Sequence, residues 1–487
     1  MAGTAPEKAN LEYQGAYKQL QFEDFMAKPM PAMWSILYYV RNDPSRLKWS
    51  QRRRGLDESI VDRAVELDRM WRRLKREIDE LRHDLNVIAS SIPKLEGRER
   101  EEAVKRAKRL RDILREKETR LKAVEEERER VLLSIPNVVH DTVPYGRGEE
   151  DNVPVRYWGK PKVWKGYLDR FLKEVEGLNV DYEVIDYKPV GHADAVVALG
   201  YADVEKASKV AGARFYYLFD DLVWLDFALM LYALDYLSRK GFKVVEPPFM
   251  LRRMALEGVI SFEDFRDMIY KVEDEDLYLI GTAEHPIAAL HIGDVIAEKD
   301  LPLLYAGVSP CFRKEAGAHG KDTKGIFRVH QFNKVEQFVF SHPDESWKWH
   351  EQLIKNAEEL WQGLGIPYRV VNICTGDLGV VAAKKYDLEA WMPAQGRYRE
   401  MVSCSNCTDW QSYRLRIRYA ESPGAPAKGY VHTLNSTAIA TQRAITAIIE
   451  NFQDTEGRVE IPKVLRKYLE PFEAAPKDYI EPRKPVK

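Results

Sequence analysis

The most regular pattern of apolar positions lies between residues 51 and 135. Apolar residues recur there at alternating spacings of three and four, first from Ala64 to Ile92 and again from Ala103 to Ile135, with Lys117 and Arg128 as polar exceptions. This repeat is the heptad seam of a coiled coil. The pattern therefore predicts two long helices that pack against each other along one stripe.

A break of a few residues, which contains Pro93 and Gly97, separates the two helices and predicts an antiparallel hairpin. Each helix would be on the order of 50 Å long, so the hairpin should project into solvent as an arm. Residues 51–135 hold 24 Lys or Arg and 20 Asp or Glu. The outward-facing cations could serve only to keep a coiled coil solvated, or they could bind phosphate groups. The sequence of the arm alone does not distinguish these two interpretations.

Beyond residue 136 the pattern changes to shorter strands and helices. A helix is predicted over residues 225–240 by an apolar stripe of Phe227, Leu231, Leu234 and Leu237. The strand GFKVVEPPFM follows and ends in a proline pair. In DLYLIGTAEHPIAAL, a strand gives way to a helix, and Thr282 and Glu284 lie at the turn between them.

Two stretches, Leu303–Glu315 and Ile326–Phe340, have strand composition and are joined by the loop AGAHGKDTKG. They are predicted to pair as an antiparallel hairpin. Side chains alternate along an extended chain, so one face of the second strand would carry Arg328, His330, Phe332, Lys334 and Glu336. Phe332 and Glu336 would be ~13 Å apart, which suggests a platform for an elongated ligand.

Two later segments add further polar groups. Residues 396–419 predict a strand that carries Glu400 and Ser403. In residues 431–453 a strand is followed by a helix that is expected to begin near Asn435, Ser436 and Thr437, residue types common at helix starts. Arg443 would lie in that helix among small residues, where it could reach a ligand.

Composition excludes several classes of protein. The 487 residues, 45% of them hydrophobic, can bury the cores of two or more domains. The most apolar run, Leu222–Leu234, is interrupted by Asp226 and is too short to span a membrane, and the first residues lack a secretory signal, so a cytosolic location is predicted. The four cysteines are too few for a disulfide framework.

Cys404 and Cys407 form a C-x-x-C pair, which alone suggests zinc. Cys311 and Cys374 supply no second pair at the spacing of a zinc site, which argues against a structural metal there. The formal net charge of −2 argues neither for nor against binding of nucleic acid.

Taken in order, these segments resemble class II aminoacyl-tRNA synthetases. The three class motifs are similar to GFKVVEPPFM, to CFRKE with FRVHQFNKVEQF, and to TLNSTAIATQR. GTAE, YREMVSCSN and the helical arm resemble the zinc-free, archaeal-like seryl-tRNA synthetases in particular. The resemblance covers about residues 33–468 and implies an α+β fold, with an antiparallel sheet core flanked by helices and an N-terminal antiparallel coiled-coil arm.

The resemblance also implies two domains and an activity. Residues 1–138 would bind tRNA(Ser) through the arm at about 57–135, and residues 139–487 would form the catalytic domain with a C-terminal tail. The implied enzyme is a cytoplasmic homodimer that uses ATP and Mg²⁺ to join L-serine to tRNA(Ser), with tRNA(Sec) left open as a second substrate. No membrane is involved.

Site residues are carried over position by position from the same resemblance. The catalytic residues would be Arg313, Glu400 and Arg443. The ATP site would comprise Arg313, Glu315, Arg328, Val329, Phe332, Glu400, Ser403 and Arg443, with Glu400 and Ser403 holding Mg²⁺. The serine site would comprise Thr282, Glu284, Arg313, Glu336, Asn435 and Thr437. Lys321 and Lys324, in the loop, could touch ATP or the acceptor end of tRNA.

Three features depart from the usual family pattern: residues 1–32 extend beyond its normal start, residues 163–189 are longer than the usual connection, and Asp226 stands where a glutamate is common. Two other functions stay open, a paralogue that activates an amino acid without charging tRNA, and a noncatalytic tRNA-binding protein. The full arm argues against the first, and Arg313, Glu400 and Arg443 argue against the second.

Overall fold

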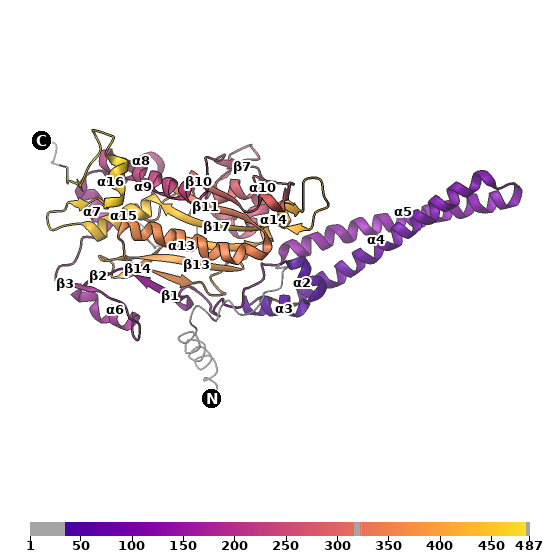
Figure 1. Cartoon of the computed structure of the whole chain (residues 1–487), viewed down its shortest axis with the longest axis horizontal. Helices are drawn as coiled ribbons and strands as arrows, with labels where there is room; N and C mark the ends of the chain where they lie inside the picture. The colour runs from indigo at the N-terminus through magenta and orange to yellow at the C-terminus, as the bar shows by residue number, and fades with distance from the viewer. Residues whose placement is uncertain (1–34, 316–321, 323, 484–487) are drawn as a thin grey trace, which may run out of the picture.

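The structure is a computed structural model that describes residues 35–315, 322 and 324–483. Its body is built on an eight-stranded sheet in the order β1-β12-β13-β14-β17-β11-β10-β6 (Figure 1). The strands are β1 Val153–Trp158, β12 Tyr368–Asn372, β13 Lys384–Met392, β14 Arg397–Thr408, β17 His432–Ala440, β11 Gln331–Ser341, β10 Leu303–Phe312 and β6 Lys243–Val245. Neighbours are antiparallel except β6, which runs parallel to β10. The predicted α+β class with an antiparallel core is confirmed.

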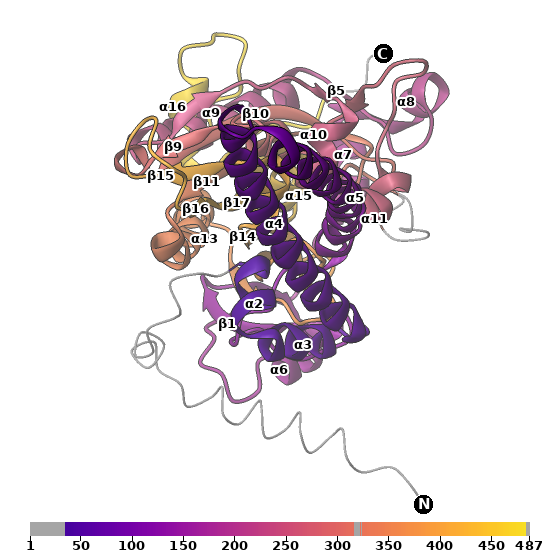
Figure 2. The ribbon, with the colours of Figure 1, turned by 90° about the vertical axis from the view of Figure 1, so that its right-hand side faces the viewer.

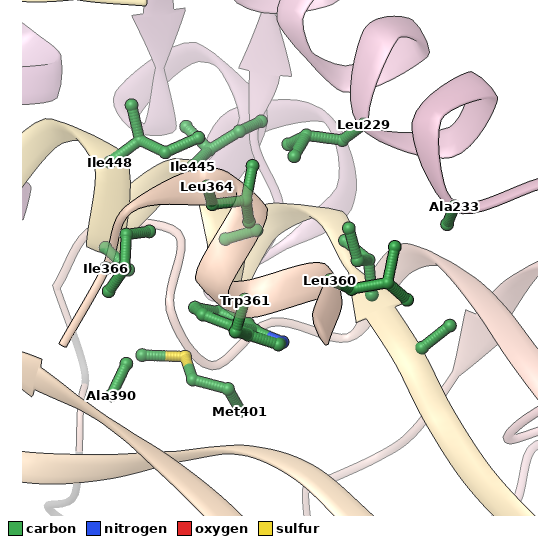
Figure 3. Packing of buried hydrophobic residues seen from close by; sticks show 14 of the residues in the cluster. Leu229, Ala233, Leu360, Trp361, Leu364, Ile366, Ala390, Met401, Ile445 and Ile448 are labelled. Carbon is green, nitrogen blue, oxygen red and sulfur yellow. The ribbon is translucent and has the colours of Figure 1, made fainter. Parts of the chain in front are cut away.

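Three helices, α9 (Asp220–Arg239), α13 (Ser346–Leu364) and α15 (Thr441–Phe452), cover one face of this sheet. Figure 3 shows Trp361 of α13 between Met401 of β14 and Ile445 and Ile448 of α15. All four side chains are at most 1% exposed. The opposite face, called the open face below, carries buried apolar side chains such as Phe338 and Phe340 as well as polar groups.

Shorter elements surround this core. The helices are α2 Ile36–Asn42, α3 Pro44–Arg53, α6 Leu168–Glu174, α7 His192–Leu199, α8 Val204–Ala211, α10 Arg253–Val259, α11 Phe262–Phe265, α12 Glu284–Ala288, α14 Trp410–Leu415 and α16 Lys463–Leu469. Small sheets pair β2 Lys162–Trp164 with β3 Glu183–Ile185, and β7 Met250–Leu251 with β8 Tyr278–Leu279. Apart from Lys162, the first of these pairs lies within the long connection at residues 163–189.

The predicted hairpin strands do pair, but both are shorter than expected. β10 ends at Phe312, so Arg313 and Glu315 lie beyond it, and β11 begins at Gln331, so Arg328 and His330 precede it. Glu315 adopts a left-handed backbone (φ 50°), which an extended strand cannot accommodate. Strand alternation therefore places only Phe332, Lys334 and Glu336 together on the open face.

The helix over residues 225–240 is confirmed as part of α9, but its predicted buried stripe is only partly right. Leu237 is buried, whereas Phe227 is 50% and Leu231 44% exposed. The buried side of α9 instead includes Leu225, Leu229 and Asp226. Asp226 accepts hydrogen bonds from Asn333 of β11 at 2.8 Å and from Gln442 of α15 at 2.9 Å, which explains how a carboxylate is kept in this core.

The arm is an antiparallel pair of helices, α4 (Ser59–Ser91) and α5 (Gly97–Ser134), joined by a single 3-10 turn. It projects from the body in Figure 1, and Figure 2 shows the two helices side by side. Seam residues such as Ala64, Leu74 and Val124 are buried between them. The described residues contain no helix long and apolar enough to cross a membrane.

The polar exceptions in the seam are paired across it. Lys117 Nζ lies 2.5 Å from Glu77 Oε2. Arg128 donates to Asp68, which is 1% exposed and also accepts from Arg41 of α2 and pairs with Arg72 at 2.9 Å. Burial opposes ionisation of Asp68, but the hydrogen bonds from Arg41 and Arg128 hold its pKa below the usual range. This carboxylate therefore joins three helices at the base of the arm.

We predict that Asp68→Ala lowers the free energy of unfolding of the arm base by about 3 kcal/mol, because it leaves the buried Arg128 guanidinium without its carboxylate. Arg63→Ala is the matched control, since Arg63 pairs with Glu127 in solvent at the same end of the arm. The control should cost less than about 1 kcal/mol. Amide exchange in α4 and α5 measures both changes, and equal losses in the two variants would contradict the prediction.

Candidate active site

The open face of the sheet carries a buried ion pair near its centre. Lys334 and Glu336, two residues apart on β11, place Nζ and Oε2 2.5 Å apart, and both side chains are nearly inaccessible. Glu336 lies opposite Gly307 of β10 and Thr437 of β17. Gly307 allows helix α12 to pack closely against the sheet here, because a Cβ there would meet Ile287 at 2.4 Å. The pair is thus held at a fixed place by strands on both sides.

A turn from the neighbouring helix α12 adds two of the predicted serine-site residues. Thr282 Oγ1 lies 3.4 Å from Glu336 Oε2 and accepts from the Glu284 backbone N–H at 3.1 Å. The Glu284 carboxylate accepts from Gln411 Nε2 at 3.0 Å. Burial and then the negative charge of Glu336 raise the pKa of Glu284 to about 7.

The structure therefore brings Thr282, Glu284, Glu336 and Thr437 into one small region, as the sequence predicted. When Glu284 is ionised, two carboxylates lie beside the Lys334 ammonium, and the Arg313 guanidinium is also close enough to favour the ionised form of Glu284. The two cations balance the two carboxylates, so a ligand that leaves this balance unchanged carries both an ammonium group and an anionic group. The region is therefore suited to a small zwitterionic ligand.

Arg313 lies beside this region, at the end of β10. Its Nε donates to the Gly281 carbonyl at 3.1 Å, and its guanidinium lies 5.3 Å from the centre of the Phe332 ring. An arginine is always charged and offers several donors in a plane, which suits carboxylate or phosphate oxygens. Arg313 thus adds a cationic group to the polar region around Glu336.

Three residues of the predicted ATP site, Glu315, Arg328 and Val329, lie between β10 and β11. Arg328 Nε donates to Glu315 at 2.5 Å, so these two residues from opposite ends of the loop are fixed against each other. The Val329 side chain is buried in the main core, which leaves its backbone as the part that could meet a ligand. Lys324 is exposed in the same loop, whereas Lys321 lies outside the described residues.

Arg443 and Glu400 meet at the far end of the open face. Arg443 Nη1 donates to the Glu400 carbonyl at 2.8 Å and lies 3.4 Å from its carboxylate. Desolvation raises the pKa of Glu400, but the nearby cations Arg443, Lys385 and Arg313 lower it, and the net effect holds this pKa below the usual range. Glu400 therefore stays ionised at neutral pH.

Ser403 lies on the same strand as Glu400, opposite Asp387 of β13. Asp387 Oδ1 is buried without a hydrogen-bond partner in the structure. The Glu400 carboxylate and the Ser403 hydroxyl are hard donors of the kind that Mg²⁺ prefers. Burial and then the charge of Glu400 raise the pKa of Asp387 well above its usual range, so Asp387 would serve as a ligand only if a bound cation favoured its ionised form. The described residues hold no cluster of three or more metal-binding side chains, so Mg²⁺ would need phosphate and water oxygens as its remaining ligands.

The prediction that a helix begins near Asn435 was wrong. Asn435, Ser436 and Thr437 lie inside β17, which hydrogen-bonds to β11 on one side and β14 on the other, and α15 begins only at Thr441. Pairing on both sides overrides the local preference of these residues for a helix start. Asn435 Nδ2 donates to Cys407 Sγ at 3.5 Å.

The cysteines of the C-x-x-C pair are both buried as free thiols. Burial raises the pKa of Cys404 and of Cys407 well above the usual range, so neither thiol ionises readily.

Sequence reasoning missed three residues of this site. The sequence analysis placed Lys334 on the correct face of the strand but gave it no role. Its position two residues before Glu336 on the same face was the signal that could have indicated their ion pair. Asp387 shares its strand face with Glu389, but nothing in the sequence pairs it with Ser403. Gln411 lies in α14, far along the chain from Glu284, so only the fold shows that they meet.

Comparison with known proteins agrees with this geometry. Residues 37–139 match the model of the seryl-tRNA synthetase N-terminal domain. Residues 270–452 match the class II tRNA synthetase core domain of the glycine, histidine, proline, serine and threonine enzymes. A serine–tRNA ligase from Archaeoglobus fulgidus is 65% identical over 452 residues, which span 93% of this chain and all of that protein.

The chain belongs to the seryl-tRNA synthetase family. A serine–tRNA ligase from Hyperthermus butylicus is 60% identical, over 93% of this chain and 99% of that protein. The seryl-tRNA synthetase of Pyrococcus horikoshii, solved in complex with ATP, is 54% identical with a TM-score of 0.85, over 92% of this chain and 99% of that one. The predicted class II fold with a helical arm is thus confirmed, and the chain is a ligase of this synthetase family.

Proposed function

We propose that this chain is an ATP-dependent serine–tRNA ligase that forms seryl-adenylate and transfers the seryl group to the 3′ end of tRNA(Ser). The observation that carries the proposal is the pair of carboxylates, Glu284 and Glu336, around Lys334, with the Arg313 guanidinium next to them. That arrangement can hold the ammonium of an amino acid on one side and its carboxylate on the other. High identity to serine–tRNA ligases over nearly the whole chain supports the same reaction.

In the first step, a serine carboxylate oxygen attacks the α-phosphorus of ATP, and pyrophosphate leaves. Glu336, with Thr282, holds the serine ammonium, and Glu284 and Thr437 accept and donate hydrogen bonds around the serine hydroxyl. Arg313 bridges the serine carboxylate and the α-phosphate and so brings together the two groups that react. Alignment and neutralisation of charge account for the catalysis, and no protein nucleophile is needed.

The adenine stacks on Phe332, while Glu315, oriented by Arg328, accepts from the adenine amino group, and the backbone beside Val329 borders the base. Arg443 binds the γ-phosphate. In the second step, a terminal ribose hydroxyl of tRNA attacks the carbonyl carbon of the adenylate, and AMP leaves. The amide of Asn435 completes the floor of the serine pocket on the strand that also carries Thr437.

Glu400 and Ser403 would hold Mg²⁺, and the ion would neutralise the triphosphate charge when bound. Arg443 keeps Glu400 ionised at neutral pH, which a cation ligand requires.

We assign tRNA binding to residues 1–138 and catalysis to residues 139–487. The arm reaches far from the sheet, and its exposed cations, for example Lys105, Arg106 and Lys108, are placed to contact phosphates of a helical RNA segment. The four free, buried cysteines suit the reducing cytoplasm, where we place the enzyme.

We also propose a homodimer. Among the described residues, no strand pairs with the outer edge of β6, and Val244 on this strand is 47% exposed. Phe227 and Leu231 of the adjoining helix α9 are also about half exposed. An open sheet edge beside exposed apolar side chains is suited to a two-fold contact with a second copy.

Exchange of pyrophosphate into ATP should depend on serine, and alanine should support it at least 100-fold less well. Alanine would leave the buried acceptor groups of Glu284 and Thr437 unpaired, and threonine should be excluded by its extra methyl group. Charging of tRNA(Ser) in the same preparation separates a complete ligase from a paralogue that only activates serine. Equal exchange with alanine and serine would contradict the assignment of the pocket.

Removing the outer part of the arm should abolish charging but spare activation. A variant in which a short linker replaces residues 76–119 keeps the paired base around Asp68 and Arg128. We expect serine-dependent exchange within about twofold of the full chain, and a fall of at least 100-fold in kcat/KM for tRNA. Charging at the full rate would show that the arm is only a coiled-coil appendage.

Replacing Lys105, Arg106, Lys108 and Arg109 with glutamine tests the phosphate contacts without shortening the arm. Arg72 is left intact, because it pairs with the buried Asp68. Binding of tRNA should weaken and depend less steeply on salt. Replacing Glu101 and Glu102 with glutamine provides a control on the same helix and should not weaken binding.

Val244→Glu should convert the dimer to a monomer in sedimentation at micromolar concentration and should lower serine-dependent exchange, because a charge would be buried at the contact. Val210→Glu is the control, since Val210 is 73% exposed on α8, away from β6. A fully active monomer of the unaltered chain would contradict the proposal.

A further inference from the structure

We propose that Gln411 is a positioning residue that fixes the Glu284 carboxylate for recognition of the serine substrate. This inference rests on the function proposed above and adds a residue that does not itself touch the ligand. Gln411 lies in the short helix α14, and its side chain is fully buried.

All hydrogen-bonding groups of the Gln411 amide are used. Its Nε2 donates to Glu284 Oε1 at 3.0 Å and to the Val259 carbonyl at 3.2 Å. Its Oε1 accepts from Thr433 Oγ1 at 2.7 Å. A flipped amide would place its oxygen against two acceptors, so only one orientation is satisfied. Gln411 must therefore present a donor to Glu284.

This donor matters because Glu284 has few other groups that favour its ionised form. Glu336 on β11 disfavours ionisation, Lys334 on the same strand and Arg313 after β10 favour it, and the Cys407 thiol on β14 is uncharged. A hydrogen bond to the ionised form lowers the pKa of a carboxyl group. Gln411 thus favours the ionised form of Glu284 against burial and Glu336, which raise the pKa of this carboxyl group to about 7.

Thr433 and Val259 hold Gln411 from opposite sides. Thr433 belongs to β17, four residues before Thr437, and Val259 ends α10. Through Gln411, these contacts fix the position of the Glu284 carboxylate relative to β17, the strand that also carries Thr437. Serine recognition would depend on this alignment, because a hydroxyl that donates to a carboxylate requires an oxygen at hydrogen-bonding distance.

The test is the pH dependence of kcat/KM for serine in pyrophosphate exchange, measured for the full-length protein and for Gln411→Met, which keeps the side-chain length but removes the donor. In the unaltered protein, activity should fall as pH drops through about 7, because Glu284 becomes protonated. In Gln411→Met this midpoint should move to higher pH by about one unit, since the ionised form loses a donor. The KM for serine at neutral pH should rise about tenfold, and the KM for ATP should stay within about twofold.

A double-mutant cycle with Glu284→Gln separates positioning from a purely structural role. In the Glu284→Gln background the pH dependence should be absent, and Gln411→Met should change the KM for serine by less than about twofold. An unchanged midpoint, or an equal effect of Gln411→Met in both backgrounds, would overturn the proposal.

If Gln411→Met does not fold, Thr433→Val is the second variant, because it removes the donor that orients the amide and should shift the midpoint in the same direction. A folded Thr433→Val protein with an unshifted midpoint would also overturn the proposal. Absence of serine-dependent exchange in the unaltered protein would instead refute the proposed function, so the two failures are distinguishable.

Discussion

The buried pair of Lys334 and Glu336 is the interaction on which the site depends. Two charges can be kept inside a sheet only if their partners are fixed, because an unpaired buried charge is strongly unfavourable. Strands β10 and β17 on either side of β11 provide that constraint, and Thr282 adds a hydroxyl beside Glu336. The helices on the opposite face bury Trp361 and its neighbours and hold the sheet in place behind the charges (Figure 3).

The arm and the site are connected through the body by buried polar contacts. Asn137, directly after the arm, donates to the carbonyls of Val381 and Cys407 and accepts from Thr408 Oγ1 at 2.9 Å. Arg54 donates to the carbonyls of Asn137 and Ala382. The base of the arm is thus attached to β14, the strand that also carries Glu400. This attachment fixes the position of the arm relative to the sheet.

Much of this architecture could be predicted from the sequence, for local reasons. The heptad seam requires two long helices, and a short break allows only an antiparallel hairpin. Alternation along β11 correctly placed Phe332, Lys334 and Glu336 on one face. These predictions succeeded because each depends on a periodicity within a single element.

The errors concern features decided by distant parts of the chain. Asn435 to Thr437 have the composition of a helix start, but sheet pairing on both sides keeps them in β17. Phe227 and Leu231 fit an apolar stripe, yet the packing of α9 on the sheet leaves them exposed. Arg128 interrupts the seam of the arm, and only the fold shows that Asp68 compensates it. The partner of Glu284 could not be predicted either, because Gln411 lies more than a hundred residues away in sequence.

The most direct test of the central claim is a crystal structure of the protein with a non-hydrolysable sulfamoyl analogue of seryl-adenylate. We predict that the serine ammonium lies within hydrogen-bonding distance of Glu336, its hydroxyl meets Glu284, and the adenine stacks on Phe332. An analogue bound with its ammonium away from Glu336, or with its base elsewhere than on Phe332, would contradict this account of the site.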